Sequence, residues 1–94
     1  MLSSHTSITA ARETVFSDLG GEVAILDLRS GEYYGLNSVG ALVWQILQAP
    51  RTLAELCREV EAAFEVDTER CMRDMVVLVG ELRDRGLVEF SEAP

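Results

Sequence analysis

The sequence contains no lysine, and its eight basic residues, all arginine, are set against 16 acidic residues. The net charge of −8 at pH 7 repels nucleic-acid phosphates, so we expect no nucleic-acid partner. No apolar run approaches the ~20 residues that a helix needs to cross a bilayer, so we expect no membrane partner. The first residues also lack the charged segment and apolar core of a secretory signal. These absences predict a cytoplasmic protein.

Cysteine and histidine are equally scarce. Cys57 and Cys71 both occupy apolar positions of helical patterns, where a free cysteine usually packs as a small buried side chain. Two cysteines without a secretory signal are not a disulfide framework, and no Cys/His cluster has zinc spacing. The single histidine, His5, lies far along the chain from both thiols, and no glycine-rich phosphate loop is present. We therefore expect no enzyme activity, no metal site and no cofactor.

What the sequence does contain is the composition of one small globular domain. Hydrophobic residues make up 48% of the 94 residues and charged residues 26%, which permits a modest core. Residues 1–12 are short and polar, which predicts a flexible N-terminus or a weak strand. The folded domain is expected over residues 13–90, and residues 91–94 are expected to be a loose tail.

Three short segments have the composition and turn boundaries of β-strands: Glu13–Asp18, Glu22–Arg29 and Glu32–Leu36. If the turn between the last two comprises Ser30–Gly31 alone, Leu28 lies opposite Tyr33. Asp27 then lies opposite Tyr34. If the three strands pair in chain order, the last of them is an edge of the sheet.

Both faces of this predicted hairpin are apolar. One face carries Val23, Ile25, Tyr34 and Leu36, and the other carries Ala24, Leu26, Leu28 and Tyr33. One face can pack on helices, whereas the other needs cover from the N-terminal segment, a second subunit or a partner. A homodimer through this second face therefore stays open.

After residue 36 the hydrophobic period changes from two to 3.6, which predicts three helices. Asn37 is a favourable N-cap for the first, which Pro50 ends. The second begins with a capping box of Thr52 and Glu55. The third begins at Asp67 or Thr68 and runs to about Arg85, with Gly86 after its end and a short strand over residues 87–90. The predicted fold is α+β: a winged helix-turn-helix with a three-stranded antiparallel sheet followed by three helices.

The third predicted helix is apolar over an unusually wide arc. One stripe, expected to face the core, contains Cys71, Met75, Leu78 and Leu82. A second stripe contains Met72, Val76 and Val79. The helix is either buried on a wide arc or forms the wall of a peptide groove, where adaptable methionine is common. Arg73 or Asp74 beside this stripe is a candidate for charge selectivity.

The predicted edge strand over residues 32–36 is poorly protected. Glu32 is its only charge and it has no proline, although proteins normally use one or the other to block an edge. Gly35 permits close approach of another backbone, and tyrosine offers a large contact area with a polar tip. These features predict peptide binding by strand addition. Tyr34 and Leu36 are expected mainly in the core, and Tyr33 on the partner side.

An ordered series of segments resembles the PqqD-like family, the leader-recognition domains of ribosomally made, post-translationally modified peptides. The series is Gly31–Asn37, Gly40, Val43–Trp44, Arg51–Leu56, Val66–Asp67 and Glu81–Val88. The resemblance covers roughly residues 13–90 and is strongest to the discrete leader-binding protein of lasso-peptide pathways. It implies a winged helix-turn-helix fold without enzymatic activity.

The family resemblance also implies a site and partners. The leader would bind as an added strand between the third strand and the third helix and would be delivered to a separate leader peptidase, with a cyclase following. The residues that map onto this site are Tyr33, Tyr34, Gly35, Leu36, Met72, Arg73, Met75, Val76 and Val79. A PqqD-type chaperone for a radical-SAM enzyme is the alternative within the family.

Two hypotheses from other classes remain. A winged-helix DNA-binding regulator would need a basic third helix. The charges there cancel: Arg70, Arg73, Arg83 and Arg85 against Glu69, Asp74, Glu81 and Asp84. A structural dimerisation module would use the second apolar face of the sheet.

Overall fold

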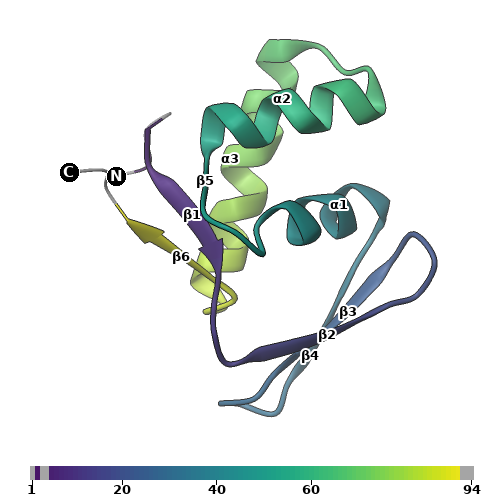
Figure 1. Cartoon of the computed structure of the whole chain (residues 1–94), viewed down its shortest axis with the longest axis vertical. Coiled ribbons are helices and arrows are strands. Elements are labelled where there is room, and N and C mark those ends of the chain that lie inside the picture. Colours follow the sequence, from purple (N-terminus) through teal and green to yellow (C-terminus); the bar gives the residue numbers. More distant parts are fainter. Residues whose placement is uncertain (1, 3–4, 92–94) are drawn as a thin grey trace.

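The computed structural model describes residues 2 and 5–91, which form two small antiparallel sheets and three helices (Figure 1). The strands are β1 Ser7–Ala10, β2 Thr14–Asp18, β3 Val23–Asp27, β4 Tyr33–Leu36, β5 Arg51–Thr52 and β6 Val88–Ser91. The helices are α1 Ser38–Ile46, α2 Leu53–Phe64 and α3 Thr68–Asp84. The predicted α+β class is confirmed, the prediction of a single sheet is wrong, and the winged helix-turn-helix stays a prediction.

The predicted sheet has the order β2-β3-β4, so β4 is an edge as expected. The hairpin register, however, is two residues away from the prediction: Tyr33 lies opposite Leu26 and not Leu28. The turn is longer than two residues, because the Asp27 N–H donates to the Glu32 carbonyl at 2.9 Å and Gly31 adopts a left-handed φ of +76°. An even shift leaves every side chain on its predicted face.

The second sheet, with the order β5-β1-β6, was not predicted. Residues 7–10, for which a flexible segment or a weak strand was expected, form its central strand, and Ile8 is fully buried. The predicted final strand pairs with it, Val88 lying opposite Ala10. The three strands come from distant parts of the chain and one has only two residues, so no local pattern indicates that they pair. Residues 92–94 of the predicted tail lie outside the described residues.

The helices begin and end where the sequence predicts. The Asn37 side chain accepts from the Gly40 N–H, and both hydrogen bonds of the Thr52–Glu55 capping box are present. Asp67 caps α3, its carboxylate accepting from the backbone N–H three residues later. Gly86, at φ +76°, ends this helix in a Schellman motif.

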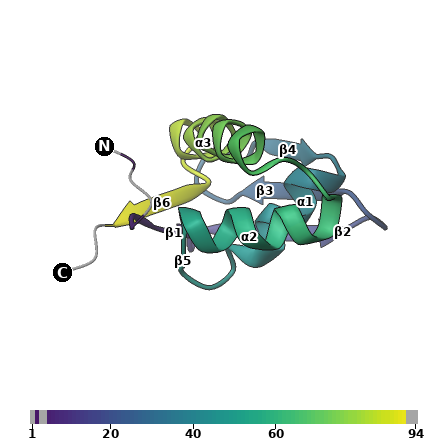
Figure 2. The same ribbon diagram turned by 90° about the horizontal axis from the view of Figure 1, so that it is seen from above.

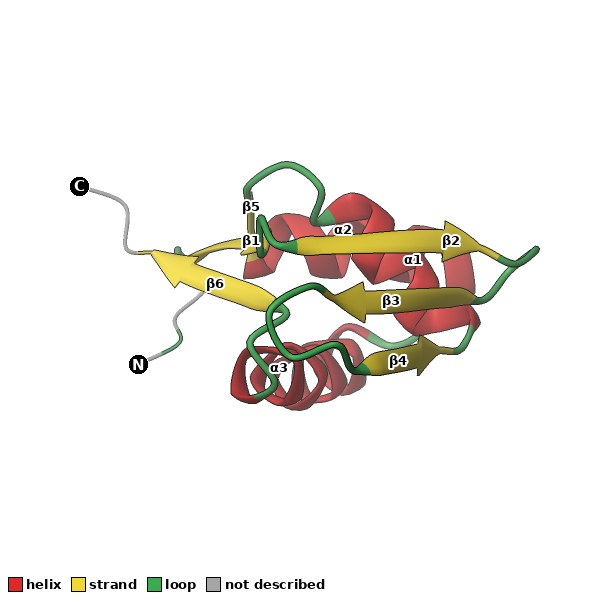
Figure 3. Cartoon of the chain, turned by 90° about the horizontal axis from the view of Figure 1, so that it is seen from below, coloured by secondary structure: helices red, strands yellow, loops and turns green. Residues whose placement is uncertain are grey.

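The helices cover only one face of the β2-β3-β4 sheet. On that face Val23 and Ile25 are buried, and Phe16 lies edge-on to Trp44 of α1 with ring centroids 6.0 Å apart. Figure 3 shows the opposite face with no helix in front of it. Because the described part of the N-terminal segment pairs within the other sheet, it does not supply the cover that this face lacks.

Replacing the central side chain of β1 tests whether the N-terminal strand is integral to the fold. Ile8→Ala is expected to lower the free energy of unfolding by about 2–5 kcal/mol, because it leaves a cavity at a fully buried position. Urea denaturation followed by circular dichroism measures the change. The control Val15→Ala, at a half-exposed strand position, should cost less than about 1 kcal/mol. Equal effects of the two substitutions would contradict the structural role of β1.

Candidate functional site

A groove lies between the edge strand β4 and helix α3. Two views at right angles to the view of Figure 1 place α3 beside β4 (Figures 2 and 3). The groove consists of two adjoining pockets of about 300 Å³ each, which share Gly35, Leu36 and Leu78. One pocket continues to Arg85 and the other to Asp74, so α3 runs opposite to β4 along the groove.

Strand β4 presents unpaired backbone groups at this groove. In an antiparallel ladder, alternate residues turn their N–H and C=O groups toward the neighbouring strand. The Asp27 N–H donates to the Glu32 carbonyl, so the backbone groups of Glu32 point toward β3. Those of Tyr34 and Leu36, two and four residues later, point the same way. The backbone groups of Tyr33 and Gly35 therefore point outward, where no other strand pairs with β4. The edge offers donors and acceptors for one additional strand.

One stripe of α3 faces the groove and the adjacent stripe faces the core. The groove-facing residues recur at helical spacing: Asp74, Leu78, Glu81 and Arg85. The buried residues are Cys71, Met75, Val79 and Leu82. Leu78, which was expected to face the core, is partly buried and packs against the core while it also lines the groove. Val79 is fully buried, which fits the wide-arc alternative for the second stripe. Three of the four residues predicted to face the core, Cys71, Met75 and Leu82, are buried.

Some predicted site residues lie at the groove and others do not. Those that line it are Tyr33, Tyr34, Gly35, Leu36 and Met75, the last of them nearly fully buried. Met72 contacts α2 through Cys57, with its sulfur 3.9 Å from the thiol, and lines a separate open hollow with Arg73. By helical spacing Val76 lies on the same flank as Met72, away from the groove. Binding roles for Met72, Arg73, Val76 and Val79 stay predictions that the groove geometry does not support.

Sequence reasoning did not assign three groove residues on α3: Leu78, Glu81 and Arg85. These three residues follow one another at intervals of three and four residues, so they share one face of the helix. The buried stripe lies between this face and Met72 and Val76 of the second predicted stripe. That spacing was visible in the sequence, but which of the three stripes faces β4 depends on how the helix packs.

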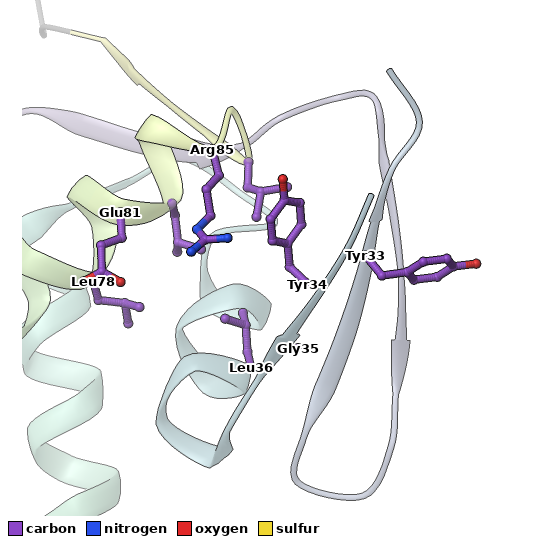
Figure 4. A pocket seen from close by; sticks show the side chains of 9 residues that line it. Tyr33, Tyr34, Gly35, Leu36, Leu78, Glu81 and Arg85 are labelled. Carbon is purple, nitrogen blue, oxygen red and sulfur yellow. The ribbon is translucent and has the colours of Figure 1, made fainter. Parts of the chain in front are cut away.

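The two tyrosines of β4 lie on opposite sides of the sheet, as alternation requires. Figure 4 shows the Tyr34 ring directed toward Arg85, whose guanidinium carbon is 5.1 Å from the ring centroid. The Tyr33 ring points away from the pocket and is 73% exposed. Only its backbone can serve the groove, and its side chain belongs to the uncovered outer face.

Charges are unevenly placed along the groove. Arg85 lies at the end next to Tyr34, with Glu81 one helical turn before it. At the other end Asp74 is within 3.7 Å of Arg70, an exposed pair. The apolar floor between the charges is formed by Leu36, Leu78 and Leu82. The arrangement suits an extended peptide with apolar side chains on one face and charge near its ends.

Comparison with known proteins identifies the family. Residues 22–88 match the family described as "Coenzyme PQQ synthesis protein D (PqqD)". The chain belongs to the PqqD family. No curated protein matches. One similar solved structure is "TbiB1 in Complex with the TbiA(beta) Leader Peptide", with a TM-score of 0.82 and 27% identity over 92% of this chain and 99% of that one.

A second solved structure, "Lasso peptide synthetase B1 complexed with the leader peptide", has a TM-score of 0.76. It is 28% identical over 87% of this chain and 96% of that one. Both similar proteins are complexes with leader peptides. The resemblance to the PqqD-like family, and to its lasso-peptide members, is confirmed.

The two thiols of this member of the PqqD family are free and buried. Burial raises the pKa of the Cys57 thiol to about 12 and also raises the pKa of Cys71. Both thiols are therefore protonated and shielded at neutral pH, which makes them poor nucleophiles. Within residues 2 and 5–91, no three His, Cys, Asp or Glu side chains gather to hold a metal ion. No helix in that part of the chain is long and apolar enough to cross a membrane.

The state of the thiols can be measured directly. At pH 8 a colorimetric disulfide reagent should modify native Cys57 and Cys71 far more slowly than it does in urea, because both are buried and their pKa values are raised. Absorbance of the released thiolate gives the rate. Rapid stoichiometric reaction of either native thiol would contradict this result and would reopen thiol chemistry.

Proposed function

We propose that this PqqD-family protein is a non-catalytic adaptor that binds the leader of a ribosomally made precursor peptide in the groove between β4 and α3. The observation that carries the proposal is the unpaired edge of β4 beside a groove of two adjoining pockets with an apolar floor. The two similar solved structures, both complexes with leader peptides, support it.

The leader binds as a further strand of the sheet. The outward groups of Tyr33 and Gly35 hydrogen-bond its main chain, which gives affinity without reading sequence. Alternate leader side chains then point toward α3 and enter the pockets lined by Leu36 and Leu78. Recognition of particular side chains in these pockets gives specificity.

The adaptor delivers the bound precursor to a leader peptidase, with a cyclase acting afterwards. The uncovered outer face of the sheet supports a partner contact, because Val15, Leu28 and Tyr33 are at least half exposed there. A leader strand added to β4 lies at the margin of this face, so a partner that covers it meets the leader at high effective concentration. A second copy of the chain is the other occupant that fits.

The family description favours a second candidate, a PqqD-type chaperone for a radical-SAM enzyme of quinone-cofactor synthesis. The two similar solved structures favour the lasso type. Both candidates use the same groove, so the leader that binds distinguishes them.

Substitution at Gly35 tests strand addition. Gly35→Pro removes one outward N–H without removing a bond to β3, and a proline is tolerated at an edge strand. We expect at least about tenfold weaker binding of a fluorescein-labelled lasso-type leader, measured by anisotropy with a scrambled peptide as control. Gly35→Ala keeps the N–H, and its new Cβ meets no atom within 4 Å, so it should bind normally. Equal affinity of the two variants would show that the peptide does not pair with β4.

A pair of substitutions on α3 distinguishes the groove from the opposite flank. Leu78→Asp places a charge in the apolar floor and should weaken leader binding at least about tenfold. Val76→Asp, at an exposed position on the other flank, should change affinity less than about twofold. Circular dichroism confirms that both variants fold. Loss of binding in Val76→Asp alone would place the leader on the Met72 side of the helix.

A further inference from the structure

Arg85 is held at one end of the groove by the turn that ends α3. It is the C-cap residue of the helix, and the Schellman hydrogen bonds of Gly86 and Leu87 to Arg83 and Leu82 set its backbone direction. Its side chain lines the pocket of Tyr34, with the guanidinium carbon 5.1 Å from the ring centroid (Figure 4). A cation is therefore placed beside the start of β4, where an added strand would pass.

The hydrogen-bonding capacity of this guanidinium is largely unused. Ion pairs within 4 Å join Arg29, Arg51 and Arg70 to carboxylates, but Arg85 has no such pair in the described part of the chain. Contact with an aromatic ring occupies a face of the guanidinium plane and leaves the N–H groups at its edge free to donate. Four other arginines also have no ion pair in the described part of the chain, so what distinguishes Arg85 is its place in the groove.

We propose that Arg85 binds an acidic side chain of the leader, as a two-pronged pair between its guanidinium and the carboxylate. This inference rests on the proposed function. The planar fork of arginine matches a carboxylate in geometry, and the Tyr34 ring lies beside this fork, 5.1 Å from the guanidinium carbon to the ring centroid. Arg85 is then a specificity-determining residue of the groove.

Glu81 limits the acidic side chain to one position of the leader. It lies in the same pocket, one helical turn or ~5.4 Å along α3 from Arg85, and has no ion pair among the described residues. Side chains on one face of a strand recur about every 6.8 Å, so a shift of two residues moves the acid from Arg85 to Glu81. Repulsion there disfavours the shifted peptide, and the preferred register is the one that places the acid at Arg85.

The experiment uses a labelled lasso-type leader in which every acidic residue is changed to its amide, and a single glutamate is then walked along it. At one position of the peptide the glutamate should raise affinity about three- to tenfold. When the glutamate is moved two residues toward the Asn37 end of the groove, this gain in affinity should disappear. Arg85→Gln should abolish the gain. Anisotropy titrations at low and at physiological salt measure each affinity, and the gain should shrink as salt rises.

Arg83 provides a matched control. It lies on the same helix turn and over an aromatic ring, 5.0 Å from the centroid of Phe90, but it does not line the groove. Arg83→Gln removes the same charge and should leave the positional gain intact. Arg85→Glu should restore binding to the peptide that carries arginine at the selected position.

The outcomes separate this inference from the proposed function. Leader binding with no positional gain, or with a gain equally sensitive to Arg83→Gln, overturns the role of Arg85 and leaves the adaptor function standing. Failure of every peptide, the unmodified leader included, to bind above the scrambled control overturns both.

Discussion

A hydrogen bond between Arg29 and Gly86 joins the turn of the β3–β4 hairpin to the end of helix α3, beside the shared core of the two elements. The Arg29 guanidinium donates to the Gly86 carbonyl at 2.7 Å, and the buried Asp27 carboxylate accepts from both the backbone and the side chain of Arg29. A Cβ at Gly86 would lie 2.7 Å from the guanidinium nitrogen, so glycine is required for the approach as well as for its φ of +76°. This contact joins the hairpin turn to the end of α3.

The contact is coupled to pH in a defined direction. The hydrogen bond from the Arg29 backbone holds the pKa of Asp27 below its usual range, with the nearby guanidinium adding to the effect. Since the folded-state pKa is lowered, the stabilisation is present above the pKa of the unfolded chain and is lost as pH falls through the lowered value. At neutral pH the ionised Asp27 therefore accepts from Arg29, whose guanidinium donates to Gly86, the residue after Arg85.

With the hairpin and α3 joined at this end, the edge of β4 remains unpaired along the groove. An unpaired strand edge is normally an aggregation hazard, and here α3 lies beside it, so the side chains of an added strand would have to fit between β4 and the helix. The same short sheet has a second apolar face on the side away from the helices, where Tyr33 is exposed. One edge strand thus contributes to two surfaces. A peptide added to it would connect the groove with the face that is free for a partner.

Features that depend on neighbouring residues along the chain could be predicted from the sequence alone. The caps at Asn37, Thr52 and Asp67 and the glycine after α3 are local hydrogen-bonding and dihedral requirements, and the two faces of the hairpin follow from strand alternation. The predicted faces are correct although the predicted register is not, because a shift of two residues keeps each side chain on the same face of the strand. The pairing in the second sheet could not be predicted, because its strands meet from three distant segments. The residues of α3 that face β4 could not be predicted either, because that helix carries adjacent apolar stripes. In the folded protein Val79 is buried and Leu78 lines the groove beside β4. A local pattern cannot show which of two adjacent apolar stripes is buried, because contacts with distant parts of the chain decide it.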